Sequence, residues 1–422
     1  MSNSRTFSVL PCELLLEIAE YLRPCHLVDF MMALPNLAYI MPRRLVARDD
    51  GFVTVLGYMA QDRGSAEICR RLIPRMEIDV NYRLRWDNSA LDIAIRRQHD
   101  VMVDLLLARP DIEVNRYGEP TNPLYHAAST RCIPSLRKLL ARKDVDLNTR
   151  TVFGWTALGH ATVLGYTKVV ELLLKAPGIV IEPEESSLAT PLSLAAERGY
   201  RGIVRLLLPL AHQTDATGTP LVDINARSHR SRTPLIRATL TGKSKVVQLL
   251  LEHDLIDVNA RDRNGRTALS HAAQMGYLTI MRLLLARPDI DVRENNSRRR
   301  TPLAHAAARG LFKTCRMLLE HPDIEPHARD STGRTPLIHA VQSGSVQVFR
   351  LLLNQCANGE EDWKDRTGRG AWDHAELKKR TEMMNIFVDY QFEKQAGSYD
   401  ENDAMDEGDE SNDSDAMDEG ED

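Results

Sequence analysis

Apolar and polar positions repeat along most of this chain with a period of 34 residues. Each period contains a Thr-Pro-Leu or Thr-Ala-Leu triplet, a run of small residues, usually a Gly, and then a leucine-rich segment. The triplets begin at Thr156, Thr190, Thr233, Thr267, Thr301 and Thr335. Self-similarity at a period of this length is typical of stacked supersecondary units, so the pattern predicts a repeat array. Such an array is mainly a surface for binding.

The pattern inside one period predicts two helices and a turn. The Thr of the triplet can cap a helix, and Pro suits the first helical turn, where a missing N–H has no cost. The Gly after the small residues permits a left-handed helix end. The leucine-rich segment, such as 169–174, predicts a second helix with a continuous apolar face. The closing segment, such as DVDLN at 144–148, predicts an extended start to a turn.

Two features depart from the regular period. The step from Thr190 to Thr233 is 43 residues, which places a nine-residue insertion near 209–219 and predicts a longer loop there. The periods at the two ends, 51–81 and the one around Trp372, are degenerate, as expected for capping repeats with one face in water. Including them, we expect about ten units between residues 51 and 390.

Charge is distributed unevenly along the chain. The net charge is −5, but residues 400–422 contain thirteen acidic and no basic residues, which leaves +8 on residues 1–399. The segment 395–422 is too polar to bury much apolar surface, so we expect an acidic disordered tail. No apolar stretch reaches the roughly 18–20 residues of a membrane-spanning helix, and the N-terminus lacks a signal-peptide pattern. Six scattered cysteines favour reduced thiols and a cytoplasmic or nuclear location.

Motifs for catalysis do not occur in the sequence. We find no GxxxxGK[ST], HExxH or GxSxG motif and no dinucleotide-binding glycine pattern. Stacked repeats also lack the enclosed pockets that catalysis usually needs. We therefore expect no enzyme, no catalytic or metal-binding residues and no cofactor.

The triplet, the Gly between two helices and the projecting turn together resemble the ankyrin repeat, fully over 149–361 and more weakly over 51–390. The resemblance implies an all-α solenoid of helix–turn–helix units with β-turn fingers, and a groove that binds another protein. In that family a His directly follows the Leu of the triplet. Here it stands one residue later, at positions that include His271, His305 and His339.

These displaced histidines share a helical face with polar positions such as Gln274, Arg309 and Gln342, so we expect them to line the concave groove. A ladder of metal sites is disfavoured by distance. Packed helices lie about 8–10 Å apart, whereas two nitrogens on one zinc ion lie within roughly 3–4 Å of each other.

A second resemblance covers residues 7–48. The segment LPCELLLEIAEYL at 10–22 resembles the start of an F-box, and residues 33–45 lack its usual Val-Cys and Trp signature. A module of roughly 40 residues cannot bury a large core alone, so we expect its apolar stripe to be covered. In the F-box family the adaptor Skp1 covers it, which implies Skp1 contacts at Leu10, Pro11, Leu14, Ile18 and Leu22. Alternatively, these helices only cap the first ankyrin unit.

Arginines are frequent at the finger tips of the C-terminal half, where stacking would align them along one edge. They include Arg230, Arg263, Arg298, Arg299 and Arg334. Either these arginines are only solvated, or they bind an acidic protein segment, because the guanidinium fork matches carboxylates. The acidic tail of the chain would compete for the same stripe at high effective concentration. Nucleic acid is disfavoured because the fingers carry few aromatic residues for stacking.

Together these features predict a protein–protein interaction protein, monomeric outside its complex. The two resemblances imply a substrate-recognition subunit of an SCF-type (Skp1–cullin–F-box) ubiquitin ligase, with the ankyrin groove holding the target. Its contribution would be proximity, without groups that make or break bonds. The alternative is an ankyrin scaffold or inhibitor with no link to ubiquitin.

Overall fold

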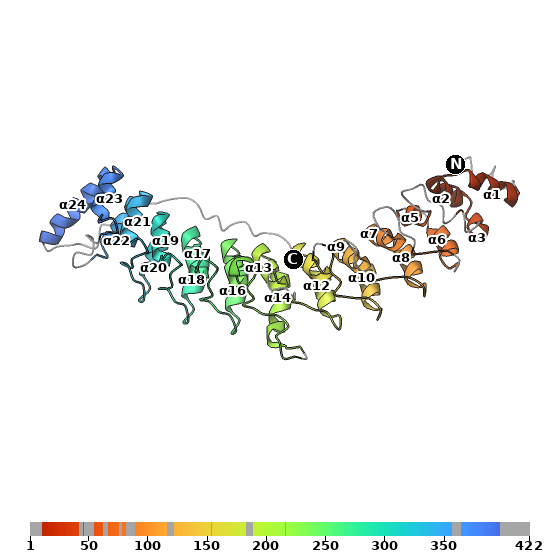
Figure 1. Cartoon of the computed structure of the whole chain (residues 1–422), viewed down its shortest axis with the longest axis horizontal. Helices are drawn as coiled ribbons and strands as arrows, with labels where there is room; N and C mark the ends of the chain where they lie inside the picture. The colour runs from red at the N-terminus through yellow and green to blue at the C-terminus, as the bar shows by residue number, and fades with distance from the viewer. Residues whose placement is uncertain are drawn as a thin grey trace. The chain divides into compact units, whose positions relative to one another are not determined.

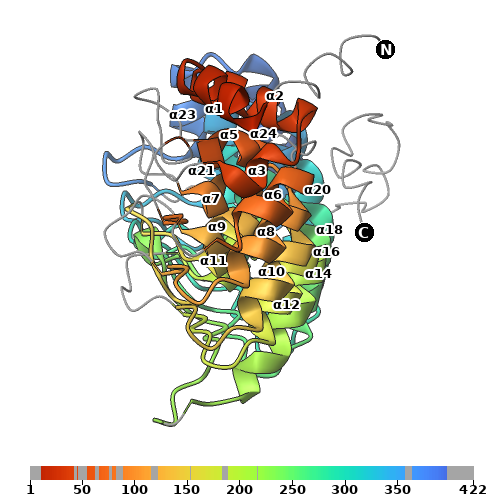
Figure 2. The same ribbon diagram turned by 90° about the vertical axis from the view of Figure 1, so that its right-hand side faces the viewer.

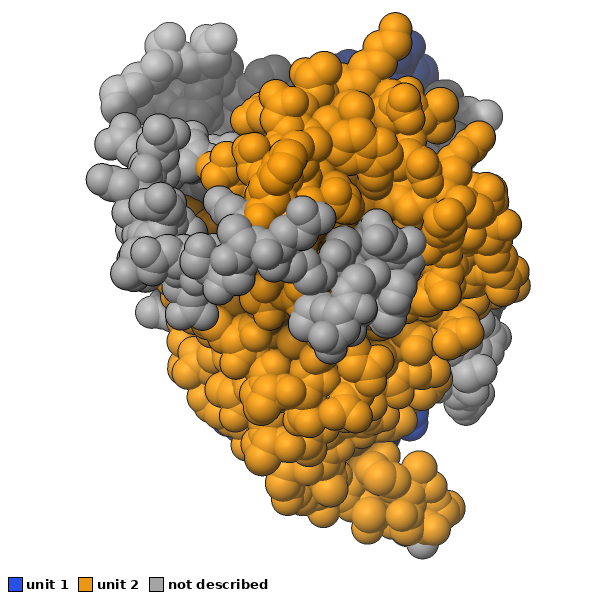
Figure 3. Space-filling model, turned by 90° about the vertical axis from the view of Figure 1, so that its left-hand side faces the viewer, with its two compact units in different colours: residues 1–181 blue, residues 182–422 orange. Residues whose placement is uncertain are grey.

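A computed structural model of the chain shows a helical protein. It describes residues 11–41, 45, 55–61, 66–75, 78–81, 89–115, 122–152, 154–182, 189–215, 217–356 and 364–396. The chain divides into two compact units, Met1–Ile181 and Glu182–Asp422, which are coloured separately in Figure 3. No strand occurs in these described ranges, whose only β-pairing is two isolated bridges, and the predicted all-α repeat architecture is confirmed.

In the part that the structure describes, the first unit has the helices α1 to α3 near its N-terminus and then helix pairs from α5 onward (Figure 1). Its helices are α1 (Cys12–Glu20), α2 (Pro24–Ala33), α3 (Leu37–Ile40), α5 (Val55–Gln61), α6 (Ala66–Leu72), α7 (Ala90–Arg96), α8 (Asp100–Leu107), α9 (Pro123–Ser129), α10 (Ile133–Leu140), α11 (Ala157–Val163) and α12 (Thr167–Leu174). From α5 onward, the pairs lie in two layers: α7, α9 and α11 contact in sequence, as do α8, α10 and α12 (Figure 2).

The second unit continues the helix pairs. Its helices are α13 (Pro191–Arg198), α14 (Arg201–Leu207), the 3₁₀ helices η3 (Leu208–His212) and η4 (His229–Ser231), α15 (Pro234–Leu240), α16 (Ser244–Leu251), α17 (Ala268–Met275), α18 (Leu278–Leu285), α19 (Pro302–Ala308), α20 (Phe312–Leu319), α21 (Pro336–Ser343), α22 (Val346–Leu353), α23 (Ala371–Leu377) and α24 (Thr381–Ala396). The described residues thus form ten helix pairs from α5 to α24. The last helix runs past the predicted end of the array at 390.

The first helix of each regular repeat begins as the sequence predicts. The Thr267 side chain accepts the N–H of Ser270 at 3.2 Å, and the same bond recurs at the other five triplets. Proline occupies the first turn of α13, α15, α19 and α21. At the other end, Gly276 closes α17 in the left-handed conformation with φ 76°, which glycine adopts without steric cost. These caps fix where each helix starts and stops.

The core of each unit lies between its two helix layers. Small residues of the first helices, such as Ala272 and Ala273, are fully buried and let neighbouring helices approach. Leucines and valines of the second helices, such as Val247 and Leu250, are equally buried. Because each repeat within a unit buries its apolar face against the next repeat, stability is shared among stacked repeats.

The insertion near 209–219 is only partly the loop that the sequence predicts. The helix α14 continues directly into η3, because Leu208 and Ala211 extend its buried apolar face. The chain then reverses in a short turn, in which the Leu221 N–H donates to the Gln213 carbonyl at 2.8 Å. The insertion therefore lengthens a helix before it forms a turn.

Among the described residues, no helix is both long enough and apolar enough to span a membrane. The predicted disordered tail spans 395–422, but its first two residues belong to α24, which ends at Ala396. The rest of the tail lies outside the described residues, as does Leu10 at the start of the F-box-like segment.

Candidate protein-interaction surface

The helix α1 divides its apolar residues between two faces. Leu15 and Ala19 are buried, whereas Leu14, Ile18 and Tyr21 are 45%, 37% and 90% exposed. These three exposed positions follow the spacing i, i+4, i+7 and therefore lie on one side of the helix. We call them the α1 face. Two of the predicted Skp1 contacts, Leu14 and Ile18, lie on it.

The remaining predicted contacts of this helix differ in their placement. Leu22 follows the helix and is half-buried, and Pro11 is exposed. Pro11 is the N-cap residue, because the helix begins at Cys12. The two residues therefore flank the α1 face at its ends.

The helices α2 and α3 attach this module to the array. The helix α2 packs on α5 and α6 and buries Leu27, Val28 and Met31, while α3 packs on α6. The Arg75 guanidinium donates to the carbonyl of Met41 at 2.7 Å, which ties the end of the module to the first repeat. These contacts fix the module without using the α1 face.

In the second unit, successive fingers are joined by backbone hydrogen bonds. The Arg263 N–H donates to the Arg230 carbonyl at 2.8 Å, and the Ser331 N–H donates to the Arg298 carbonyl at 2.8 Å. Equivalent bonds run from Ser297 to Asn264 and from Arg366 to Thr332, both at 2.9 Å. A Cβ atom at Gly265 would lie 2.9 Å from the Ser297 nitrogen, so the fingers are in close contact there. The expected alignment of finger tips is therefore present.

The finger arginines fall into two groups. The outer arginines, Arg230, Arg263, Arg298 and Arg299, are exposed and form no ion pair with another described residue. We call this group the finger row. The inner arginines precede the capping Thr and lean toward the next repeat: Arg300 pairs with Asp330 at 3.2 Å and Arg334 with Asp365 at 3.3 Å.

The placement of Arg334 corrects the prediction that it is available to a partner. Its side chain is 29% exposed and already paired, because its position directs it to the buried Asp365 of the next finger. The finger row therefore consists of the outer positions only.

The prediction that His271, His305 and His339 line the groove is wrong. Their residues are only 3%, 3% and 1% exposed. The Nε2 of His271 lies 3.0 Å from the Asp262 carboxylate, and that of His339 lies 2.9 Å from the Asp330 carboxylate. The third histidine, His305, bonds the Asn296 amide at 3.1 Å. The displaced histidines are therefore struts between a helix and its own finger.

The Asp or Asn side chain of each strut also shapes the finger. The Asp330 carboxylate accepts the backbone N–H groups of Thr332 at 2.8 Å and Arg334 at 3.1 Å. Asp262 and Asn296 accept the corresponding pair of N–H groups in their own fingers. In the fingers that carry Arg263, Arg298 and Arg299, one buried side chain thus fixes the turn that presents these arginines. A sequence pattern could have revealed these hydrogen-bonded pairs. An Asp or Asn stands nine residues before each of four histidines, His271, His305, His339 and His374.

Burial and hydrogen bonding shift the pKa values of these struts. Burial alone would raise the pKa of Asp330, but bonds from His339, Thr332 and Arg334 outweigh it and hold the pKa below its usual value. Burial, together with the nearby cationic side chains of Arg266 and Arg300, lowers the pKa of His305 to about 3. The His305 imidazole is therefore neutral at physiological pH and serves as a structural group.

In the first helix of a repeat, the histidine position is buried and an exposed position lies at the C-terminal end of the helix. Eight residues after the capping Thr, Leu164 is exposed in the first unit, and Arg198, Met275 and Arg309 are exposed in the second. Sequence reasoning missed this position, although its constant offset from the triplet identifies it. These side chains, together with the finger row, are available to a protein partner.

One protein-family model, described as ankyrin repeats in three copies, matches residues 124–220, 192–296 and 287–365. The three matches together cover more than half of the chain and include the finger row. No F-box family model is matched. Ankyrin repeats support a role in protein–protein interaction. Because the matched region carries the regular helix pairs and fingers of both units, the chain belongs to the ankyrin-repeat family.

Proposed function

We propose that this chain is the substrate-recognition subunit of an SCF-type (Skp1–cullin–F-box) ubiquitin ligase. In this role the α1 face binds Skp1 and the ankyrin repeats hold the target protein. The chain contributes proximity between target and ligase and supplies no catalytic group. Its place of action would be the cytoplasm or the nucleus.

The α1 face is the observation that carries this proposal. A capping element normally turns its apolar side toward the array and presents polar residues to water. Here α2 and α3 already attach the module, and α1 still exposes Leu14, Ile18 and Tyr21. Burying a large apolar side chain at an interface contributes about 1.5–3 kcal/mol. A partner that covers this face would therefore gain affinity from residues that the array does not use.

The second contact of the proposal joins the target to the repeats. The finger row presents guanidinium groups that lack carboxylate partners among the described residues, so it suits an acidic segment of the target. Met275 and Arg309 offer further contacts at the ends of their helices. This surface therefore defines the target by its chemistry, as a protein with an acidic segment.

Binding of the full-length chain to immobilised, purified Skp1 tests the first contact. We expect the wild type to bind and the Leu14→Asp/Ile18→Asp variant to lose roughly 30-fold or more in affinity, because two exposed anchors become charged. The variant should keep its fold, since both side chains are already in water. Met275→Asp is the matched control, because Met275 is 45% exposed, as Leu14 is. We expect it to bind Skp1 like the wild type.

A scaffold or inhibitor without a link to ubiquitin is the competing function. It is favoured by the close packing of α2 on α5 and α6, as in a cap. A wild-type chain that fails to bind Skp1 would remove the ligase proposal and leave this one.

A further inference from the structure

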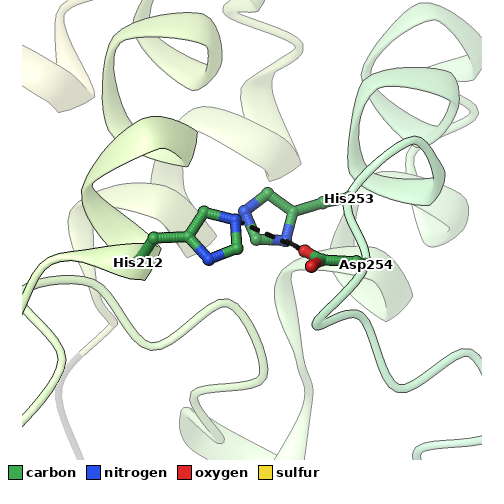
Figure 4. A group of neighbouring side chains, drawn as sticks. All are labelled: His212, His253 and Asp254. Carbon is green, nitrogen blue, oxygen red and sulfur yellow. Dashed lines mark ion pairs between the residues drawn. The ribbon is translucent and has the colours of Figure 1, made fainter.

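The nine-residue insertion places a histidine beside the following repeat. Because α14 continues into η3, His212 at the end of η3 reaches the loop that follows α16. There its ring stacks on the ring of His253, with centroids 4.7 Å apart and planes inclined by 16°. Asp254 completes the group, and Figure 4 shows the three side chains meeting from these two segments. A regular repeat would end before His212.

Distances within this group match those between ligands of one small divalent cation. The His212 Nε2 and the His253 Nδ1 each lie 3.3 Å from the Asp254 Oδ1. One potential ligand atom from each residue lies within 4.8 Å of the other two. In tetrahedral zinc sites, bonds of about 2.0–2.1 Å place ligand atoms ~3.3–3.4 Å apart. The carboxylate is therefore already at ligand distance from both imidazoles.

The two rings need one adjustment to share an ion. Stacked imidazoles direct their in-plane lone pairs side by side, so one ring must turn before both converge. His212 can turn, because its side chain is 53% exposed at the end of a short helix. His253 is held in place, with its side chain only 9% exposed. The buried ligand is thus fixed and the exposed ligand is adjustable.

The two ring nitrogens of His253 lie in different surroundings. Its Nε2 is buried and has no hydrogen-bond partner among the described residues. Its Nδ1 faces both the Leu255 N–H and the Asp254 carboxylate, each at 3.3 Å. A proton on Nδ1 would oppose the Leu255 N–H, whereas a lone pair there opposes the carboxylate. A metal ion between Nδ1 and the carboxylate would remove the repulsion between the Nδ1 lone pair and the Asp254 carboxylate.

The local backbone also favours positive charge. The cluster lies at the C-terminal ends of η3 and α16, where helix carbonyl groups create a negative potential. This differs from the buried struts, in which the Nε2 atoms of His271 and His339 are each hydrogen-bonded to an aspartate carboxylate. Only the insertion brings two imidazoles and an exposed carboxylate together in the described part of the chain.

We propose that His212, His253 and Asp254 form a binding site for a zinc-class transition-metal ion, with water as the fourth ligand. Imidazole and carboxylate ligands suit Zn²⁺, and also Cu²⁺ and Ni²⁺, better than Ca²⁺ or Mg²⁺. The bound ion would join the end of one repeat to the loop of the next, and would stabilise this part of the array. The inference is independent of the ligase proposal.

Titration of the metal-free, full-length chain with Zn²⁺ in a calorimeter tests the site. The wild type should show a class of sites that falls by one ion per chain in His212→Ala and Asp254→Asn, or weakens roughly tenfold or more. Both variants change exposed side chains, so helical circular dichroism should be unchanged. His229→Ala, which removes another exposed histidine of the same unit, is the matched control and should bind like the wild type.

Visible absorption with Co²⁺ as the probe gives an independent readout. The wild type and His229→Ala should develop the intense bands of a tetrahedral site, and His212→Ala should not. Equal Zn²⁺ binding by all four proteins would overturn the proposal, because any uptake would then come from other groups. A wild type that binds no Zn²⁺ would overturn it as well.

Discussion

The α1 face and the finger row are both exposed, but their chemistry is opposite. The α1 face is apolar and lies on a helix outside the matched ankyrin repeats. The finger row is cationic, and three of its members, Arg263, Arg298 and Arg299, lie on turns that are held by buried struts inside the matched repeats. Apolar contacts depend little on salt, whereas contacts between exposed charges weaken as salt increases. The proposed adaptor function assigns a different partner to each of these two surfaces.

The largest effect is expected when a strut is removed. Asp330→Ala leaves the buried His339 and two finger N–H groups without their acceptor, so we expect a loss of about 3–5 kcal/mol in the free energy of unfolding. Urea denaturation followed by circular dichroism measures it. Asp323→Ala, which removes an exposed carboxylate paired with Arg293, is the control and should cost no more than about 1 kcal/mol. Equal losses in the two variants would contradict the strut interpretation.

Acidification should weaken the array next. The folded pKa of His305 is about 3. Burial likewise lowers the pKa of His126, in α9, to about 4, whereas the ordinary value for histidine is 6.5. The unfolded chain therefore binds these protons first, and stability is lost as pH falls below about 6.5. As the pH falls from 7.5 to 5, each of these two histidines should lower the free energy of unfolding by about 2 kcal/mol.

The change in urea midpoint between these two pH values measures the effect. His305→Gln should reduce the pH dependence, because the titrating group is gone. Since no histidine is buried among the described residues of α1 to α3, Skp1 binding at pH 6 should remain close to its value at pH 7.5. An undiminished pH dependence in His305→Gln would rule out this residue as its source.

Charge reversal in the finger row should separate the two surfaces. Arg263→Glu/Arg298→Glu should weaken binding of a synthetic peptide with the sequence of residues 400–422 by roughly tenfold per residue, because attraction becomes repulsion. Fluorescence anisotropy at low salt measures the affinity. Arg282→Glu, on the exposed side of α18 away from the fingers, should have a much smaller effect. Similar losses for both changes would mean that the peptide binds only the general charge of the array.

Deletion of residues 400–422 should give the smallest change. If the acidic tail competes for the finger row, its removal should tighten peptide binding by up to roughly tenfold at low salt, because a tethered competitor acts at high effective concentration. The gain should disappear near physiological salt, where screening acts within about 8 Å. An unchanged affinity at low salt would mean that the tail does not occupy the row.

Local signals predicted the fold well. The Thr caps, the proline positions and the left-handed Gly276 are short-range features, so the sequence specifies them directly. The roles of the histidines and of Arg334 were not predicted correctly, because both depend on which buried carboxylate or amide lies within reach. The nine-residue spacing from Asp262 to His271 was visible, but only the folded finger shows that it closes a hydrogen bond.

The His212 cluster illustrates the same limit more strongly. His212 and His253 are separated by a regular helix pair, and no local motif links them. Only the continuation of α14 into η3 brings their rings together. Contacts of this kind depend on how neighbouring repeats stack.

A salt series with both partners tests the account most directly. The affinities of the full-length chain for purified Skp1 and for the 400–422 peptide are measured in parallel from low to high ionic strength. We expect Skp1 binding to change little and to be lost in Leu14→Asp/Ile18→Asp, while peptide binding falls steeply and is lost in Arg263→Glu/Arg298→Glu. An absence of Skp1 binding, or one salt dependence shared by both partners, would contradict the claim of two chemically distinct contacts.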